Sequence, residues 1–218
     1  MTAIRFYTHP VSNFAAKVEI VLRLKRIAFV ALAPPDGYGS PAYKAIVPAG
    51  TIPAIVDGDL VLSESETIVE YLEEAYGEPR LLPGDPAERA RLRLLARFHD
   101  TRLEPPLRAL FAQMNPFGRQ RAAVDAEMAS FRTRLADLAR MTRPDPWLGG
   151  ARLTLADTAY PATLHLARRM FEILGDPLAL PPALEPWRAR LEAVEEVAVV
   201  LRSADEAITA WLRSKNAL

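Results

Sequence analysis

The spacing of the apolar residues differs on the two sides of residues 77–86, a segment rich in glycine and proline. Before this segment, short runs of strand-forming residues stand between runs of helical period. After it, the apolar residues recur at helical spacing throughout. The change predicts two domains, residues 1–77 and residues 87–218, joined by a linker over residues 78–86.

The first domain is predicted to belong to the α/β class, with a mixed sheet whose apolar faces are covered by helices. The continuous apolar run at residues 27–32 indicates a buried strand, and Asp57-Gly58-Asp59 indicates a tight hairpin turn. The predicted strands are residues 4–8, 27–32, 54–57 and 60–63, and the predicted helices are residues 13–25, 43–47 and 65–75.

The second domain is predicted to be all-α. One apolar stripe runs through residues 92–114, where Pro105-Pro106 predicts that the helix bends or restarts. Thr154 and Asp157 have the spacing of a capping box at the start of a further helix, which is a folding feature rather than a binding site. The further predicted helices are residues 124–138, 155–174, 184–201 and 204–212.

Composition excludes several functions. The 218 residues include 27 basic and 27 acidic ones, and residues 1–77 hold 6 basic and 9 acidic ones, so neither part has the basic excess that nucleic acid binding requires. There is no cysteine, which excludes disulfides, thiolate metal sites and a cysteine nucleophile. The three histidines, His9, His99 and His165, lack metal-ligand spacing, so no metal site is predicted.

The sequence predicts neither a membrane-spanning segment nor a secretion signal. No apolar run approaches the roughly 20 residues that span a bilayer. The first residues predict a strand beginning at Ile4 rather than a secretion signal. A cytoplasmic protein that does not bind membranes is therefore expected.

Ser12 lies between the first predicted strand and the first predicted helix. A hydroxyl there is close to unpaired backbone N–H groups and to the positive end of the helix dipole. It could donate a hydrogen bond to a bound thiol and favour the thiolate, which is the nucleophilic form. The alternative is that Ser12 or Asn13 only caps the helix.

Two further segments could bind a peptide-like ligand. Ile52-Pro53 precedes a strand, and a cis bond there would turn the backbone of Ile52 outward, free to pair with an extended ligand. Glu64 and Ser65 open a helix, with Ser65 as the predicted N-cap, and together they could receive the ammonium and carboxylate of an amino acid. The alternatives are an ordinary trans proline and an ordinary helix cap.

Four segments, in this order, resemble the glutathione S-transferase family. They are residues 6–18 (FYTHPVSNFAAKV), residues 48–55 (PAGTIPAI), residues 62–72 (LSESETIVEYL) and residues 148–157 (LGGARLTLAD). The resemblance spans nearly the whole chain. It implies a thioredoxin-like N-terminal domain that binds glutathione and an all-helical C-terminal domain that contributes the site for an electrophile.

The resemblance also implies a role for individual residues in binding glutathione. Ser12 corresponds to the serine that contacts the thiol, with Tyr7 and Asn13 as rival donors. The implied contacts to the rest of glutathione are Ile52 and Pro53 for the cysteinyl part, Glu64 and Ser65 for the γ-glutamyl part, and Thr51 and Lys44 near the glycine carboxylate. Thr51 replaces the lysine or glutamine that is frequent in the family, so Lys44 is expected to supply the charge.

The family resemblance implies conjugation of the glutathione thiolate to a small, mainly apolar electrophile, as in detoxification. Phe14, Arg102 and Phe111 are the candidate residues for the electrophile site, and a homodimer is implied. Three alternatives stay open: a glutathione-dependent isomerase of the maleyl-acid type, a peroxidase, and a non-catalytic ligand-binding member of the family.

Overall fold

The computed structural model describes residues 3–218 and divides into two compact units. The first unit ends at Leu81, and the second runs from Leu82 to Leu218. The boundary falls within residues 78–86, and each unit is described by itself below.

The first unit contains a four-stranded mixed sheet, which confirms the predicted α/β class. Its strands are β1 (Ile4–Tyr7), β2 (Phe29–Leu32), β3 (Ala54–Asp57) and β4 (Leu60–Ser63), in the order β2-β1-β3-β4. The pair β1/β2 is parallel, whereas β1/β3 and β3/β4 are antiparallel. The prediction that β2 is buried is wrong, because β2 is an edge strand and the side chain of Val30 is 49% exposed.

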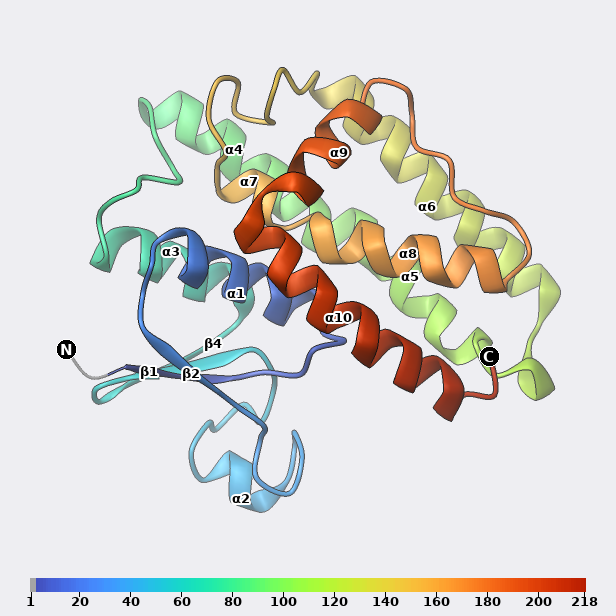
Figure 1. Ribbon diagram of the computed structural model, residues 1–218, viewed down its shortest axis with the longest axis horizontal. Helices are drawn as coiled ribbons and strands as arrows, with labels where there is room; N and C mark the ends of the chain where they lie inside the picture. The colour runs from blue at the N-terminus through green and yellow to red at the C-terminus, as the bar shows by residue number, and fades with distance from the viewer. Residues whose placement is uncertain (1–2) are drawn as a thin grey trace. The chain divides into compact units, whose positions relative to one another are not determined.

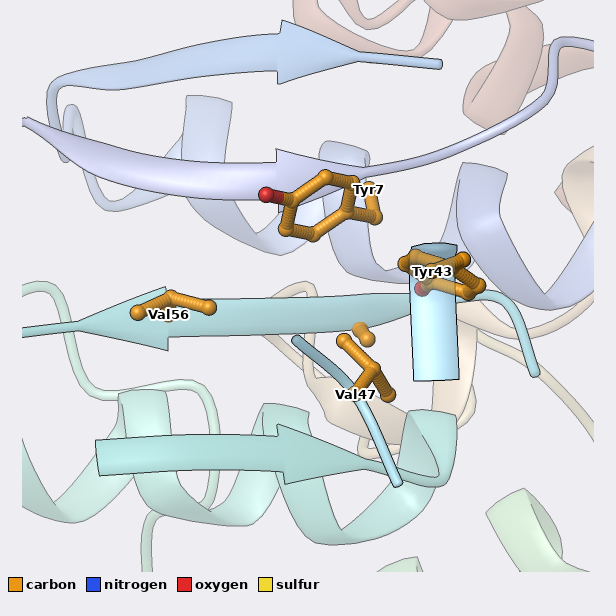
Figure 2. Packing of buried hydrophobic residues seen from close by; sticks show 5 residues of the cluster. Tyr7, Tyr43, Val47 and Val56 are labelled. Atoms are coloured by element: carbon orange, nitrogen blue, oxygen red, sulfur yellow. The ribbon is translucent and has the colours of Figure 1, made fainter. Parts of the chain in front are cut away.

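Helices cover both faces of this sheet. α1 (Asn13–Leu24) and α3 (Ser65–Ala75) lie side by side on one face, and the short α2 (Pro41–Lys44) lies on the other (Figure 1). A buried cluster joins β1 and β3 to α2 and to the segment that follows α2 (Figure 2). Its members are Tyr7, Tyr43, Val47, Ala54 and Val56. The Tyr43 hydroxyl donates a 2.9 Å hydrogen bond to the carbonyl of Thr51, which fixes the residue before Ile52-Pro53.

The second unit is helical, as predicted. Its α-helices are α4 (Pro86–Phe98), α5 (Glu104–Ala109), α6 (Arg121–Met141), α7 (Leu155–Thr158), α8 (Pro161–Ile173), α9 (Glu185–Ala193) and α10 (Glu195–Ser214). A π-helical turn, η1 (His99–Leu103), joins α4 to α5, and short 3₁₀ turns follow as η2 (Leu110–Gln113) and η3 (Pro116–Gly118). Pro105 and Pro106 lie in the first turn of α5, where the missing N–H groups cost little, so the predicted restart is confirmed.

The predicted bounds of the last three helices, residues 155–174, 184–201 and 204–212, are wrong. Residues 155–174 form two helices rather than one, since α7 ends at Thr158 and Pro161 starts α8. Residues 184–201 are interrupted at Val194, whose backbone is extended. From there α10 continues through residues 202 and 203, where a gap was predicted, because its apolar face continues from Leu201 to Ile208.

Thr154 and Asp157 form the predicted capping box at the start of α7. The buried carboxylate of Asp157 accepts hydrogen bonds of 2.8 Å from the N–H and the hydroxyl of Thr154, 2.9 Å from the N–H of Leu148 and 2.8 Å from the indole of Trp187. Burial raises the pKa of Asp157, and these four bonds to its charged form act in the opposite direction. One carboxylate thus joins the 148–149 turn, α7 and α9.

This packing predicts that Gly149→Ala destabilises the protein. A Cβ at position 149 would lie 2.5 Å from Cγ2 of Thr154 and 3.1 Å from Cδ2 of Leu92. We expect the free energy of unfolding to fall by roughly 1–3 kcal/mol, as for other overpacked sites. Chemical denaturation checks this, with Gly118→Ala as control, because a Cβ there has no atom within 4 Å. Equal stability of the two variants would contradict the account of the turn.

Candidate functional site

The strand register brings three separate segments to one edge of the first unit's sheet. Tyr7, the last residue of β1, pairs with Ala54, the first residue of β3. Ala54 also pairs with Ser63, the last residue of β4. The segment after β1, the Ile52-Pro53 pair before β3 and the turn from β4 into α3 therefore meet at the same place.

Helices α1 and α3 run parallel, so both N-termini lie at this edge. Near the start of α1, Lys17 contacts Glu66 at the start of α3, with 2.5 Å between Nζ and Oε2. Just after the end of α1, Lys25 contacts Glu73 near the end of α3, with 2.8 Å between Nζ and Oε2. The positive ends of two helix dipoles thus converge on the segments that the strand register brings together.

Ser12 is the N-cap of α1. Its side-chain oxygen accepts a 3.2 Å hydrogen bond from the N–H of Ala15, which satisfies one donor of the first turn. Capping uses one lone pair of the hydroxyl oxygen, so the O–H group of Ser12 can still donate a hydrogen bond to a ligand. The cap and the thiol contact, which the sequence presents as alternatives, are compatible.

The two rival donors differ from Ser12 in their surroundings. Tyr7 is only 4% exposed and belongs to the buried cluster that joins β1 and β3 to α2, where its ring lies 5.2 Å from that of Tyr43 (Figure 2). Asn13 is 2% exposed, and its buried Nδ2 has no hydrogen-bond partner within residues 3–218. Ser12 is partly exposed, and it is the most accessible of the three.

The Ile52–Pro53 peptide bond is cis. Within the described residues, the N–H and the C=O of Ile52 take part in no hydrogen bond, so both can pair with an extended ligand. Thr51 is exposed, and the side chain of Lys44 runs beside Gly50, since a Cβ on Gly50 would lie 2.9 Å from Cε of Lys44. The structure therefore places the side chain of Lys44 beside Gly50, the residue before Thr51.

Glu64 and Ser65 open α3, but the predicted cap is wrong. Ser65 is the first helical residue, and the N-cap is Glu64, whose backbone has φ +71° and whose side chain makes no capping bond. The turn at Glu64 places Ser65 inside the helix. The N–H groups of Ser65, Glu66 and Thr67 accordingly have no partner among residues 3–218, as suits a site for a carboxylate.

The candidate residues for the electrophile site belong to both units. Phe14, in the first unit, is half-buried on α1. In the second unit Arg102 is exposed on the π-helical turn. Phe111 is half-buried, with its ring centre 4.9 Å from that of Trp211 and 4.5 Å from the guanidinium of Arg108.

The second unit also contains a cavity of about 540 Å³ between α4, the end of α6 and the 148–149 turn. Its lining includes Leu92, Leu95, Met141 and Leu148, and none of the predicted site residues lines it.

Within residues 3–218, no group of three or more His, Asp or Glu side chains is placed to hold a metal ion. No helix in the described part of the chain has the length and apolarity to cross a membrane.

Sequence reasoning did not identify Lys17 as part of this site. Its side chain is fully buried, and its ammonium lies 3.4 Å from the hydroxyl of Ser65. A usable signal was present, because Lys17 lies three and four residues before Ile20 and Val21, on the apolar face of the helix. A charged residue on such a face needs a buried partner.

Known protein families and solved structures match this chain. Residues 6–80 match the family model "Glutathione S-transferase, N-terminal domain". A glutathione S-transferase from Pseudomonas putida is 30% identical over 172 residues, which cover 75% of this chain and 74% of that relative. A maleylacetoacetate isomerase from Pseudomonas aeruginosa is 41% identical over 98 residues, but the match covers 42% of this chain and less than half of that relative, 46%.

The solved structures include a theta class glutathione S-transferase from Xanthomonas axonopodis pv. citri with glutathione bound. It superposes with a TM-score of 0.76 at 27% identity, over 92% of this chain and 98% of that chain. The likeness covers both the α/β and the helical parts of the sequence.

The buried hydroxyl of Tyr43 predicts a loss of stability at alkaline pH. Burial, with a smaller contribution from Tyr7, raises the pKa of Tyr43 from 10.0 to about 12. The folded protein therefore keeps a proton that the unfolded chain loses, so this residue's contribution to stability falls as the pH rises from 10 to 12. Tyr43→Phe should make that fall shallower by up to about 1.4 kcal/mol per pH unit.

Denaturation at a series of pH values from 8 to 12 measures this slope. Tyr38→Phe is the matched control, because Tyr38 is 70% exposed. The same slope in wild type and Tyr43→Phe would contradict the assigned burial of the Tyr43 hydroxyl.

Proposed function

Since the chain belongs to the glutathione S-transferase family, we propose that it is a glutathione transferase that conjugates the glutathione thiolate to a small, mainly apolar electrophile. The observation that carries the proposal is the convergence of Ser12, Ile52 and the start of α3 at one edge of the sheet. Each of the three offers a group that suits a different part of an extended γ-glutamyl tripeptide.

Glutathione binds along the sheet edge in this proposal. The unpaired N–H and C=O of Ile52 hydrogen-bond the cysteinyl main chain, as in the addition of a strand. The free N–H groups of α3 and the Ser65 hydroxyl take the γ-glutamyl carboxylate, and Glu64 takes the ammonium. Lys44, whose side chain runs beside Gly50, attracts the glycine carboxylate.

Ser12 then acts on the sulfur. Its hydroxyl donates a hydrogen bond to the thiolate while its oxygen continues to cap α1. The positive end of the α1 dipole adds to this stabilisation, so the pKa of the bound thiol falls and the nucleophilic form is populated near neutral pH. The serine does not ionise and forms no covalent bond, and the thiolate attacks the electrophile directly.

The acceptor site and the assembly are part of the same proposal. Phe14 is the candidate contact to the electrophile in the first unit, and Phe111 and Arg102 are the candidate contacts in the second. The protein acts as a cytoplasmic homodimer that takes part in detoxification, with glutathione as co-substrate and no metal.

A second candidate is a glutathione-dependent isomerase. The supporting observation is the local match to the maleylacetoacetate isomerase from Pseudomonas aeruginosa. Such a reaction needs the same bound thiolate but releases glutathione at the end, so glutathione is not consumed. Assaying glutathione consumption with an aromatic halide and isomerisation of maleylacetoacetate side by side distinguishes the two.

The role of Ser12 predicts the behaviour of Ser12→Ala. Loss of the hydrogen bond to sulfur should lower kcat by about a hundredfold, as when an enzyme loses one hydrogen-bond donor to an anion in its active site. The Kd for glutathione should change little. The apparent pKa in the pH–rate profile should rise as well. Ser12→Thr keeps the hydroxyl and the cap and serves as control, and a kcat of Ser12→Ala equal to that of wild type would remove Ser12 from the mechanism.

The binding role of the start of α3 predicts the result of a calorimetric titration with reduced glutathione. Wild type should bind, and Glu64→Ala/Ser65→Ala should lose measurable affinity because the contacts to the γ-glutamyl group are gone. Ser203→Ala/Glu206→Ala, a pair of exposed residues on α10, is the matched control. No binding in wild type would favour a non-catalytic member of the family.

A further inference from the structure

Lys17 is a fully buried lysine directly behind the first turn of α3. Its Nζ lies 2.5 Å from Oε2 of Glu66 and 3.4 Å from Oγ of Ser65. Both partners lie in that first turn, and Ser65 itself is 6% exposed. A buried ammonium is costly unless it is paired, so its position here is fixed by these contacts.

Glu66 raises an electrostatic problem for the proposed glutathione site. A carboxylate in the first turn of a helix interacts favourably with the helix dipole. The same position is where the γ-glutamyl carboxylate would bind, and two carboxylates side by side repel one another. The short ion pair with Lys17 neutralises Glu66 and leaves the dipole and the free N–H groups of α3 for the ligand.

Lys17 also determines how the Ser65 hydroxyl can be used. An ammonium is a donor without lone pairs, so Ser65 must accept the hydrogen bond from Lys17. The hydroxyl hydrogen is then left for another acceptor, and among the described residues none accepts it. A ligand carboxylate at the start of α3 is such an acceptor.

We propose that Lys17 is a positioning residue for the γ-glutamyl carboxylate, because it neutralises Glu66 and turns the Ser65 hydroxyl toward the ligand. The proposal rests on the proposed function. Lys17 touches no part of glutathione itself and acts through Ser65 and Glu66.

The test compares two ligands by calorimetry, with competition titration where the heat is small. One is reduced glutathione, and the other is γ-aminobutyryl-cysteinyl-glycine, which lacks only the α-carboxylate of the γ-glutamyl group. Wild type should bind glutathione about tenfold to a hundredfold more tightly, the range for a charge-assisted contact. In Lys17→Met this ratio of Kd values should fall to near one, and Lys17→Arg should retain most of it.

Lys25→Met is the matched control. Lys25 is also fully buried, pairs with Glu73, and donates hydrogen bonds of 2.9 and 3.0 Å to the carbonyls of Gly77 and Pro79, at the other end of α3. Its loss should lower stability as much as that of Lys17 without changing the ratio. The double variant Lys17→Met/Glu66→Gln also removes the unpaired carboxylate. It should recover part of the preference for glutathione over the analogue.

The outcomes separate the two proposals. If wild type binds neither ligand, the proposed function fails. If wild type distinguishes the ligands and folded Lys17→Met distinguishes them equally well, the function stands and the role of Lys17 is overturned. A fall in the ratio of the same size in Lys25→Met also overturns it, because the effect would then be a general loss of packing.

Discussion

Helices α1 and α3 are held together at both ends by a buried lysine of the α1 region and a glutamate of α3. Lys17 pairs with Glu66 at one end and Lys25 pairs with Glu73 at the other. Such pairs add little net stability, but removing one partner leaves an uncompensated charge and costs about 3–5 kcal/mol. The pairs therefore act mainly as a constraint: they fix the position of α3 along α1, with the two N-termini level.

The proposed chemistry depends on this arrangement. If α3 were antiparallel to α1 or shifted by one turn, Ser12 and Ser65 would not lie at the same edge of the sheet. The strand register brings Ile52 to that edge independently, through the pairing of Ala54 with Tyr7 and Ser63. One ligand can then meet a main-chain segment, a hydroxyl and an uncapped helix end at once, and each recognises a different part of it. Electrostatic preorganisation of this kind lowers a thiol pKa without a metal or an ionised base.

Much of the fold could be predicted from local pattern, and the failures have physical causes. The strands at residues 54–57 and 60–63 and the helix at residues 65–75 have the bounds that period and turn residues predicted. The burial of the strand at residues 27–32 was wrong because an apolar run does not reveal that a strand lies at a sheet edge. The cap at Ser65 was wrong because the cap position depends on the left-handed turn at Glu64. The role of Lys17 could not be predicted because it depends on the contact between α1 and α3, which are far apart in the sequence.

Every proposed role above requires that glutathione binds at the edge of the sheet in the first unit. A ¹H–¹⁵N NMR titration of the full chain with reduced glutathione tests it most directly, since every N–H group involved reports separately. The largest shifts are expected at Ile52, at residues 65–67 and at residues 12–15. Shifts confined to the helical unit, for instance at the cavity lined by Leu92 and Met141, or no shifts at saturating glutathione, would contradict it.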